Sequence, residues 1–160
     1  MLTGLKNIRV GVVGAGSTTA KHYLPRWQKM DGVEVVAVAN RSQDSARRVA
    51  GRFDIAQVHA HWPSLVASDE VDAVYVGTWP YLHRDVSIAA LNNGKHVLTQ
   101  ARMAMSSAEA RDMLASARLH PNLVAQVVPT RHISHALRVL PELLGSGYTC
   151  LLYTSPSPRD

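Results

Sequence analysis

The chain of 160 residues is 46% hydrophobic and 18% charged, and its formal net charge is +5. This composition is typical of a globular domain and excludes a disordered or fibrous chain. The basic residues are spread out and no aromatic residues alternate with them in a stripe, so we expect a solvated basic surface and no nucleic-acid binding.

Short apolar runs alternate with longer amphipathic segments along the chain. The runs predict strands at Arg9–Val13, Val33–Ala39, Ala73–Val76, His96–Thr99 and Leu123–Val128. The segments between and after them predict helices at Ser17–Lys29, Gln43–Phe53, Arg84–Asn93, Ser107–Leu119 and Ile133–Leu144. Alternating β and α segments with continuously apolar strands predict an α/β fold with a doubly wound parallel sheet, the Rossmann-like class. Ligands of such sheets bind outside the carboxyl ends of the strands.

Local signals mark three helix features. Ser106 and Glu109 have the spacing of a capping box at a helix start. Gly94 after Asn93 provides a left-handed residue at a helix end. Pro25 lies inside the first predicted helix and should kink or shorten it, because proline has no N–H to donate.

A glycine-rich loop joins the first predicted strand to the first helix. Gly14 permits a tight turn, and Gly16 lets the backbone approach a pyrophosphate, which the helix N-terminus attracts. Thr19 occupies the third glycine position, so the fingerprint is incomplete. A structural turn or an adenosyl-cofactor site of the methyltransferase type are the alternatives to a dinucleotide site. The predicted cofactor residues of this loop are Gly14, Ala15, Gly16, Ser17 and Thr18.

The end of the second predicted strand bears on the choice of dinucleotide. An acidic residue there would bind the ribose 2′-hydroxyl of NAD, but the sequence reads Asn40-Arg41-Ser42. Arginine pairs with a 2′-phosphate and asparagine does not repel it, so these three residues predict NADP, with NAD as the alternative. Alternatively, Arg41 simply faces solvent before a helix.

The last residues break the pattern of the rest of the chain. The segment Cys150–Asp160 holds two prolines and no helical or strand period. Its eleven residues also correspond to the translation of a DNA string that resembles a transposase sequencing adaptor. We therefore expect one domain over residues 1–147, a non-native or disordered tail over 148–160, and a longer parent protein. Cys150 is the one cysteine of the sequence, so an internal disulfide is excluded.

These motifs and their order resemble the Gfo/Idh/MocA family of oxidoreductases, from about Ile8 to Gly147. The matching pieces are the loop 14–17 with His22 and Pro25, and the segments 37–42, 72–76, 78–83 and 93–98. The segment 78–83 looks like the family's Thr-x-Pro-x-x-His motif at the cofactor. The resemblance therefore implies further cofactor residues at Thr78, Trp79, Pro80 and His83.

The resemblance implies an NAD(P)-dependent oxidoreductase that transfers a hydride to or from a sugar, inositol or related polyol. It also implies a second α/β substrate domain, which this chain lacks, and a homo-oligomeric parent protein. We therefore expect the chain alone to bind the cofactor but to be inactive. The alternative is a non-catalytic dinucleotide-binding sensor or regulator derived from the family.

The chain departs from the family where Glu-Lys-Pro usually follows the strand 96–99. The sequence reads Gln100-Ala101-Arg102, so the expected lysine is replaced by an alanine that carries no charge. Gln100 is a candidate for cofactor binding and catalysis, because it can hydrogen-bond where glutamate would. Arg102 is a candidate for an electrostatic role toward substrate or cofactor, although it is a poor proton carrier; a structural role is the alternative.

The sequence gives little indication of metal binding or membrane contact. His59 with His61, and His132 with His135, have spacings that place two ligands together, but no third ligand follows, so we expect no metal site. No apolar run is long enough to cross a bilayer and no export signal precedes the first strand. We therefore expect no membrane contact and a cytoplasmic location.

Overall fold

The computed structural model describes residues 7–128 and 145–146. The chain divides into two compact units, Met1–Val128 and Pro129–Asp160, and the fold below is that of the first unit. The predicted helix Ile133–Leu144 lies outside the described residues, as do residues 147–160.

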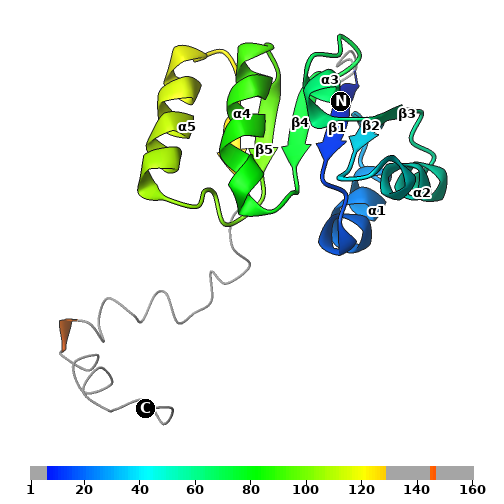
Figure 1. Cartoon of the computed structure of the whole chain (residues 1–160), viewed down its shortest axis with the longest axis horizontal. Coiled ribbons are helices and arrows are strands. Elements are labelled where there is room, and N and C mark those ends of the chain that lie inside the picture. Colours follow the sequence, from blue (N-terminus) through cyan, green and yellow to red (C-terminus); the bar gives the residue numbers. More distant parts are fainter. Residues whose placement is uncertain (1–6, 129–144, 147–160) are drawn as a thin grey trace. The chain divides into compact units, whose positions relative to one another are not determined.

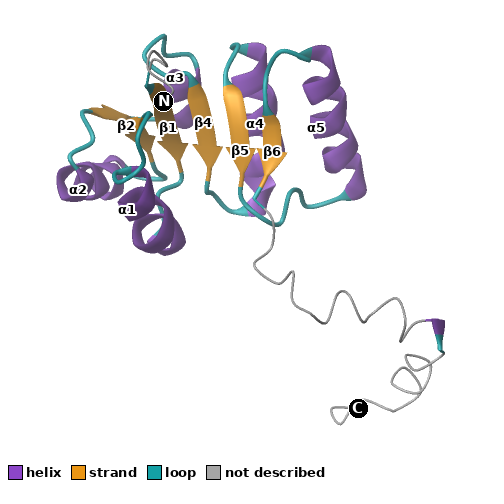
Figure 2. Cartoon of the chain, turned by 180° about the vertical axis from the view of Figure 1, so that it is seen from behind, coloured by secondary structure: helices purple, strands orange, loops and turns teal. Residues whose placement is uncertain are grey.

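Parallel strands form one sheet in the order β3-β2-β1-β4-β5-β6. Figure 2 shows β2, β1, β4, β5 and β6 side by side in this order. The strands are β1 (Ile8–Val13), β2 (Val33–Ala39), β3 (Gln57–His59), β4 (Ala73–Val76), β5 (His96–Thr99) and β6 (Ala125–Val127). The chain runs outward from β1 to β3 and, in the other direction, from β4 to β6. This confirms the predicted doubly wound parallel sheet.

Helices cover both faces of the sheet (Figure 1). One buried cluster joins the sheet to α1 and α2, and the other joins it to α3 and α4, with α5 against α4. The helices are the π-helix η1 (Thr19–Tyr23), α1 (Leu24–Trp27), α2 (Gln43–Phe53), α3 (Trp62–Val66), the 3-10 helix η2 (Pro80–Leu82), α4 (His83–Asn92) and α5 (Ser107–Leu119).

The apolar runs of the sequence are explained by burial on both faces. In β1, Val12 belongs to the cluster under α1 and α2, whereas Val13 belongs to the cluster under α3 and α4. In β4, Tyr75 and Val76 divide between the two clusters in the same way. Side chains alternate along a strand, so the part of a central strand that is covered on both faces is apolar at successive positions.

The helix that follows β1 is modified at Pro25, as expected. Because Pro25 has no N–H, the preceding turn is open, and the Leu24 N–H donates to the Thr19 carbonyl five residues back. This bond defines the π-helix η1. The helix then ends at Trp27, two residues before the predicted end at Lys29.

The two other predicted boundaries are confirmed in outline. The Ser106 hydroxyl accepts from the Glu109 N–H at 3.2 Å, which caps the start of α5. The Glu109 carboxylate accepts from the Met105 N–H at 2.9 Å, one residue before the position that a capping box requires. Gly94 follows α4 with φ +71°, the left-handed conformation expected of it.

Candidate functional site

A cleft of about 940 Å³ lies at the carboxyl ends of the strands, where β1 and β4 are neighbours but lead to opposite halves of the sheet. Its walls come from the loops after β1, β2, β4 and β5 and from the start of α3. Open α/β sheets bind ligands at such a switch point, so the topology alone marks this cleft as the candidate site.

The loop after β1 needs glycine at two positions for different reasons. Gly14 has φ +89°, and a Cβ there would lie 2.6 Å from the Thr78 backbone N. The backbones that leave β1 and β4 therefore touch at this point, with no room for a side chain. Gly16 is exposed, and a Cβ there would meet nothing within 4 Å. Because Gly16 has no side chain, the space next to its backbone stays open to the cleft.

The helix after this loop begins at the cleft. Its first hydrogen bond runs from the Ala20 N–H to the Gly16 carbonyl at 2.9 Å, so the N–H groups of Ser17 and Thr18 precede the helix ladder. Both residues are exposed and line the cleft. A helix start with exposed N–H groups attracts an anion, and a phosphate group is one such anion.

Of the three residues after β2, two form hydrogen bonds that hold the fold together, and the third is free to contact a ligand in the cleft. The Asn40 side chain accepts from the Ala15 N–H at 2.7 Å and donates to the Ser45 hydroxyl at 3.0 Å. Asn40 therefore ties the glycine loop to α2, a role that its sequence position did not reveal. Ser42 caps α2 by accepting from the Ser45 N–H and does not line the cleft. Arg41 is exposed, lines the cleft and forms no ion pair with a described residue.

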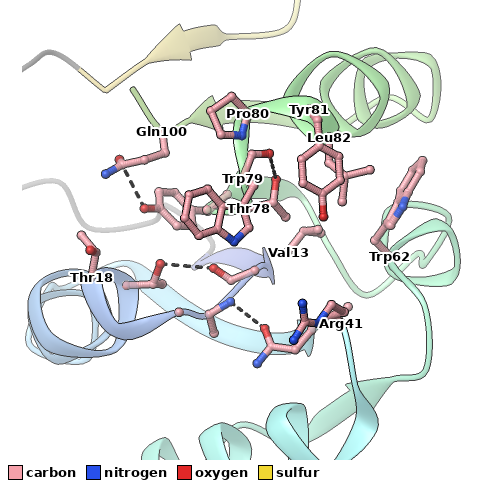
Figure 3. A pocket seen from close by; sticks show the side chains of 18 of the residues that line it. Val13, Thr18, Arg41, Trp62, Thr78, Trp79, Pro80, Tyr81, Leu82 and Gln100 are labelled. Carbon is pink, nitrogen blue, oxygen red and sulfur yellow. Dashed lines mark hydrogen bonds between the residues drawn. The ribbon is translucent and has the colours of Figure 1, made fainter. Parts of the chain in front are cut away.

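On the β5 side, Gln100 is held by two tyrosines. The hydroxyls of Tyr23 and Tyr75 donate to its Oε1 at 3.1 and 3.4 Å. Figure 3 shows the side chain of Gln100 among the residues that line the cleft. Burial raises the pKa of Tyr75 to about 12, and a hydrogen bond with Thr19 acts in the opposite direction. Tyr75 therefore stays a neutral donor to Gln100 at physiological pH.

His83 lies behind the cleft rather than in it. It is fully buried, and its ring nitrogens contact two backbone carbonyls, Nε2 to Thr78 and Nδ1 to Arg102, each at 2.9 Å. The ring thus connects the segment after β4 to the segment after β5. Among the predicted cofactor residues, His83 and Ser42 are the two that do not line the cleft.

The structure brings the other predicted residues together around one space. The predicted residues that line the cleft are Gly14, Ala15, Gly16, Ser17, Thr18, Asn40, Arg41, Thr78, Trp79, Pro80, Gln100 and Arg102. Sequence reasoning did not select Trp62, although it follows β3, or Gly77, although it directly follows β4. A systematic search of the residue after each predicted strand would have found Gly77.

Among the described residues, the permanent charges that line the cleft are all positive. Of the described residues that line it, Arg41 and Arg102 carry a permanent charge and none carries a carboxylate. Ala101 lies between Gln100 and Arg102 on the same wall, where the resemblance would place a lysine. The cleft therefore suits an anionic ligand.

Residues 7–128 and 145–146 contain no helix long and apolar enough to cross a membrane. In the same part of the chain, no three His, Cys, Asp or Glu side chains are grouped so that they could hold a metal ion. His59 contacts the Ser64 hydroxyl at 3.1 Å, and His132 with His135 lies outside the described residues.

The strand order and a glycine loop at the switch point define a dinucleotide-binding Rossmann domain. Residues 8–127 match the Gfo/Idh/MocA family, an oxidoreductase family with an NAD-binding Rossmann fold. The chain belongs to this family, as its resemblance predicted.

Similar proteins include enzymes with different substrates. The chain is 37% identical over 111 residues to dTDP-3,4-didehydro-2,6-dideoxy-alpha-D-glucose 3-reductase of Actinomadura kijaniata, covering 69% of the chain and 33% of that protein. It is 33% identical to inositol 2-dehydrogenase/D-chiro-inositol 3-dehydrogenase of Shouchella clausii, covering 75% of the chain and 35% of that protein. The chain thus spans about a third of the length of these relatives.

The fold agrees with solved structures. A 3-ketoreductase from Actinomadura kijaniata, in complex with NADP and TDP-benzene, has a TM-score of 0.74 and 31% sequence identity. The match covers 89% of this chain and 43% of that one. A variant of the same reductase with one lysine replaced by alanine was also solved with NADP and TDP-benzene.

Proposed function

We propose that this chain binds NADP in preference to NAD and is the cofactor domain of an oxidoreductase acting on a sugar, inositol or related polyol. The observation that carries the proposal is Arg41, an exposed guanidinium at the carboxyl end of β2 in a cleft whose described lining has no carboxylate. A 2′-phosphate pairs with arginine, whereas NAD selection relies on an acidic residue at this strand end.

We assign a part of the dinucleotide to each wall of the cleft. The helix start at Ser17 and Thr18 suits the pyrophosphate, and Arg41 suits the 2′-phosphate. The nicotinamide then belongs on the other side, toward Thr78 and Gln100. A bound nicotinamide supplies the hydride chemistry, while these residues bind and orient it.

The replacement of the family's lysine by Ala101 does not argue against cofactor binding. In the 3-ketoreductase from Actinomadura kijaniata, a lysine-to-alanine variant was solved with NADP. Membership of an oxidoreductase family also favours an enzyme over a non-catalytic sensor. Catalysis, a homo-oligomeric state and a cytoplasmic location of the whole protein remain predictions.

Titration of the full chain with NADPH and NADH tests the proposal, with tryptophan fluorescence or calorimetry as the readout. Trp62 and Trp79 line the cleft, so a bound nucleotide should change their emission. We expect NADPH to bind more tightly than NADH. The substitution Arg41→Gln should weaken NADPH about tenfold or more, since a charge-assisted hydrogen bond contributes about 1.5–3 kcal/mol, and should leave NADH nearly unchanged.

The matched control is Arg48→Gln, which removes the same charge from an exposed position of α2 outside the cleft. Equal loss of NADPH affinity in both variants would show a general charge effect and refute the role of Arg41. A folded chain that binds neither nucleotide would refute the proposed function.

A further inference from the structure

Gln100 lines the cleft, and its amide nitrogen has no hydrogen-bond partner among the described residues. Its Oε1 accepts from the hydroxyls of Tyr23 and Tyr75, and its Nε2 is the other end of the amide. Its Nε2 donates to no described residue, and in Figure 3 this nitrogen points away from the phenol that donates to Oε1. Two N–H groups therefore remain available on the β5 side of the cleft.

Arg102 adds a positive charge to the same wall. Its carbonyl contacts the buried ring of His83 at 2.9 Å, which fixes its backbone position relative to Thr78. Arg102 is an exposed residue of the cleft lining, and its guanidinium forms no ion pair with a described residue. A guanidinium offers five N–H donors in a planar fork that matches a carboxylate.

Arg102 lies far from Arg41 along the edge of the sheet. Arg41 follows β2 and Arg102 follows β5, with β1 and β4 between those strands. Three strand spacings of about 4.8 Å each separate the two strand ends by roughly 14 Å. One small anionic group cannot contact both arginines, so a phosphate held by Arg41 leaves Arg102 without an anion.

The donor set of this wall matches a carboxylate better than a hydroxyl group. Each hydroxyl of a neutral polyol both donates and accepts, and a side-chain carboxylate is a strong acceptor for it. No described residue of the cleft lining provides a carboxylate, whereas Gln100 Nε2 and Arg102 only donate. A carboxylate only accepts, and its hydrogen bonds to a guanidinium are charge-assisted.

We propose that Arg102 and Gln100 Nε2 bind a carboxylate of the substrate, so that the polyol of the proposed function carries an acid group, as a sugar acid does. The inference rests on the proposed function, because a cofactor with its phosphate on Arg41 directs the nicotinamide to this wall. Arg102 then orients the acid beside the cofactor and does not exchange a proton with it.

Ligand-observed saturation-transfer NMR on the full chain, in the presence of saturating NADP, tests the proposal. The probes are glycerate and glycerol, which share a three-carbon skeleton and differ in one carboxylate. We expect glycerate to bind at least about tenfold more tightly than glycerol, the factor that one charge-assisted hydrogen bond provides. The substitution Arg102→Gln should abolish this difference, and NADP affinity should stay the same.

Two further variants separate the proposed contact from general effects. Gln100→Glu keeps an acceptor for both tyrosines but replaces the Nε2 donor by a negative charge, so it should weaken glycerate more than glycerol. Arg111→Gln removes an equal charge from the exposed surface of α5 and should change neither probe.

Equal binding of glycerate and glycerol to the NADP-loaded chain would overturn the proposal. So would an Arg102→Gln variant that loses NADP affinity but keeps its preference for glycerate, because Arg102 would then serve the cofactor. Failure of NADP itself to bind is measured separately and refutes the proposed function, so the two failures are distinguishable.

Discussion

The two glycines of the loop after β1 are required for different reasons, and substitution should separate them. Gly14→Ala forces a side chain into a left-handed position against the Thr78 backbone, at a cost of about 1–3 kcal/mol from strain alone. Gly16→Ala meets nothing within 4 Å, so its stability should change by no more than about 0.5 kcal/mol. The Gly16→Ala methyl group nevertheless occupies space next to the bound pyrophosphate and should weaken NADPH.

Thermal unfolding and NADPH titration of both variants check this prediction. We expect a lower Tm for Gly14→Ala, and an unchanged Tm with reduced affinity for Gly16→Ala. Undiminished NADPH binding by Gly16→Ala would mean that the dinucleotide does not approach the backbone at this loop.

Tyr75 makes a predictable contribution to stability at alkaline pH. Burial raises its pKa from an ordinary value of 10.0 to about 12, so the folded state keeps a proton that the unfolded state loses. Its stabilising contribution is therefore complete below pH 10 and disappears as the pH rises from 10 through about 12. Tyr75→Phe removes this pH dependence, although it also removes a donor to Gln100.

Denaturant unfolding at a series of pH values measures the effect. The free energy of unfolding should fall more steeply above pH 10 in the native chain than in Tyr75→Phe. Tyr81→Phe, at a position that is 57% exposed, is the control and should follow the native chain. Parallel curves for the native chain and Tyr75→Phe would contradict the prediction.

At the scale of elements, the sequence predicted the largely apolar strands, including the short β6, and missed β3 and α3. All the strands with four or more residues were predicted, because burial on both faces makes them continuously apolar. β3 has three half-buried residues and α3 has five, too few for a period to be recognised. Trp62 at the start of α3 consequently remained unassigned although it lines the cleft.

The same limit applies to polar contacts between elements. Asn40 was predicted from its strand-end position, but its hydrogen bonds to the Ala15 N–H and the Ser45 hydroxyl depend on how β2 and the glycine loop meet. His83 was expected near the cofactor, and only the three-dimensional structure shows that its ring joins two segments from behind. A motif identifies such residues without revealing which side of a loop they face.

The contribution of the α5 N-cap to the free energy of unfolding can be measured. Ser106→Ala removes the hydroxyl that accepts from the Glu109 N–H and should lower the free energy of unfolding by about 1 kcal/mol. Ser107→Ala is the matched control, because Ser107 is exposed one residue further and its side chain caps nothing among the described contacts. Urea unfolding of both variants should show a lower midpoint for Ser106→Ala alone.

At the scale of the whole molecule, the family match and the cleft occupy the same part of the chain. The match covers residues 8–127, and the residues that line the cleft all lie between Val13 and Arg102. The six strands also lie within residues 8–127. We therefore expect cofactor binding to depend on the first unit, Met1–Val128, and we predict that turnover needs groups from outside this unit.

Chains of three lengths test this division and the domain limit predicted at residue 147. A chain that ends at Val128 keeps the sheet and the cleft, so it should bind NADPH as tightly as the full chain. A chain that ends at Gly147 should match the full chain in both affinity and Tm, because residues 148–160 are predicted to lie outside the domain. A higher Tm at 147 than at 128 would support the helix predicted at Ile133–Leu144. Loss of NADPH affinity on shortening to Val128 would instead place part of the cofactor site beyond the sheet.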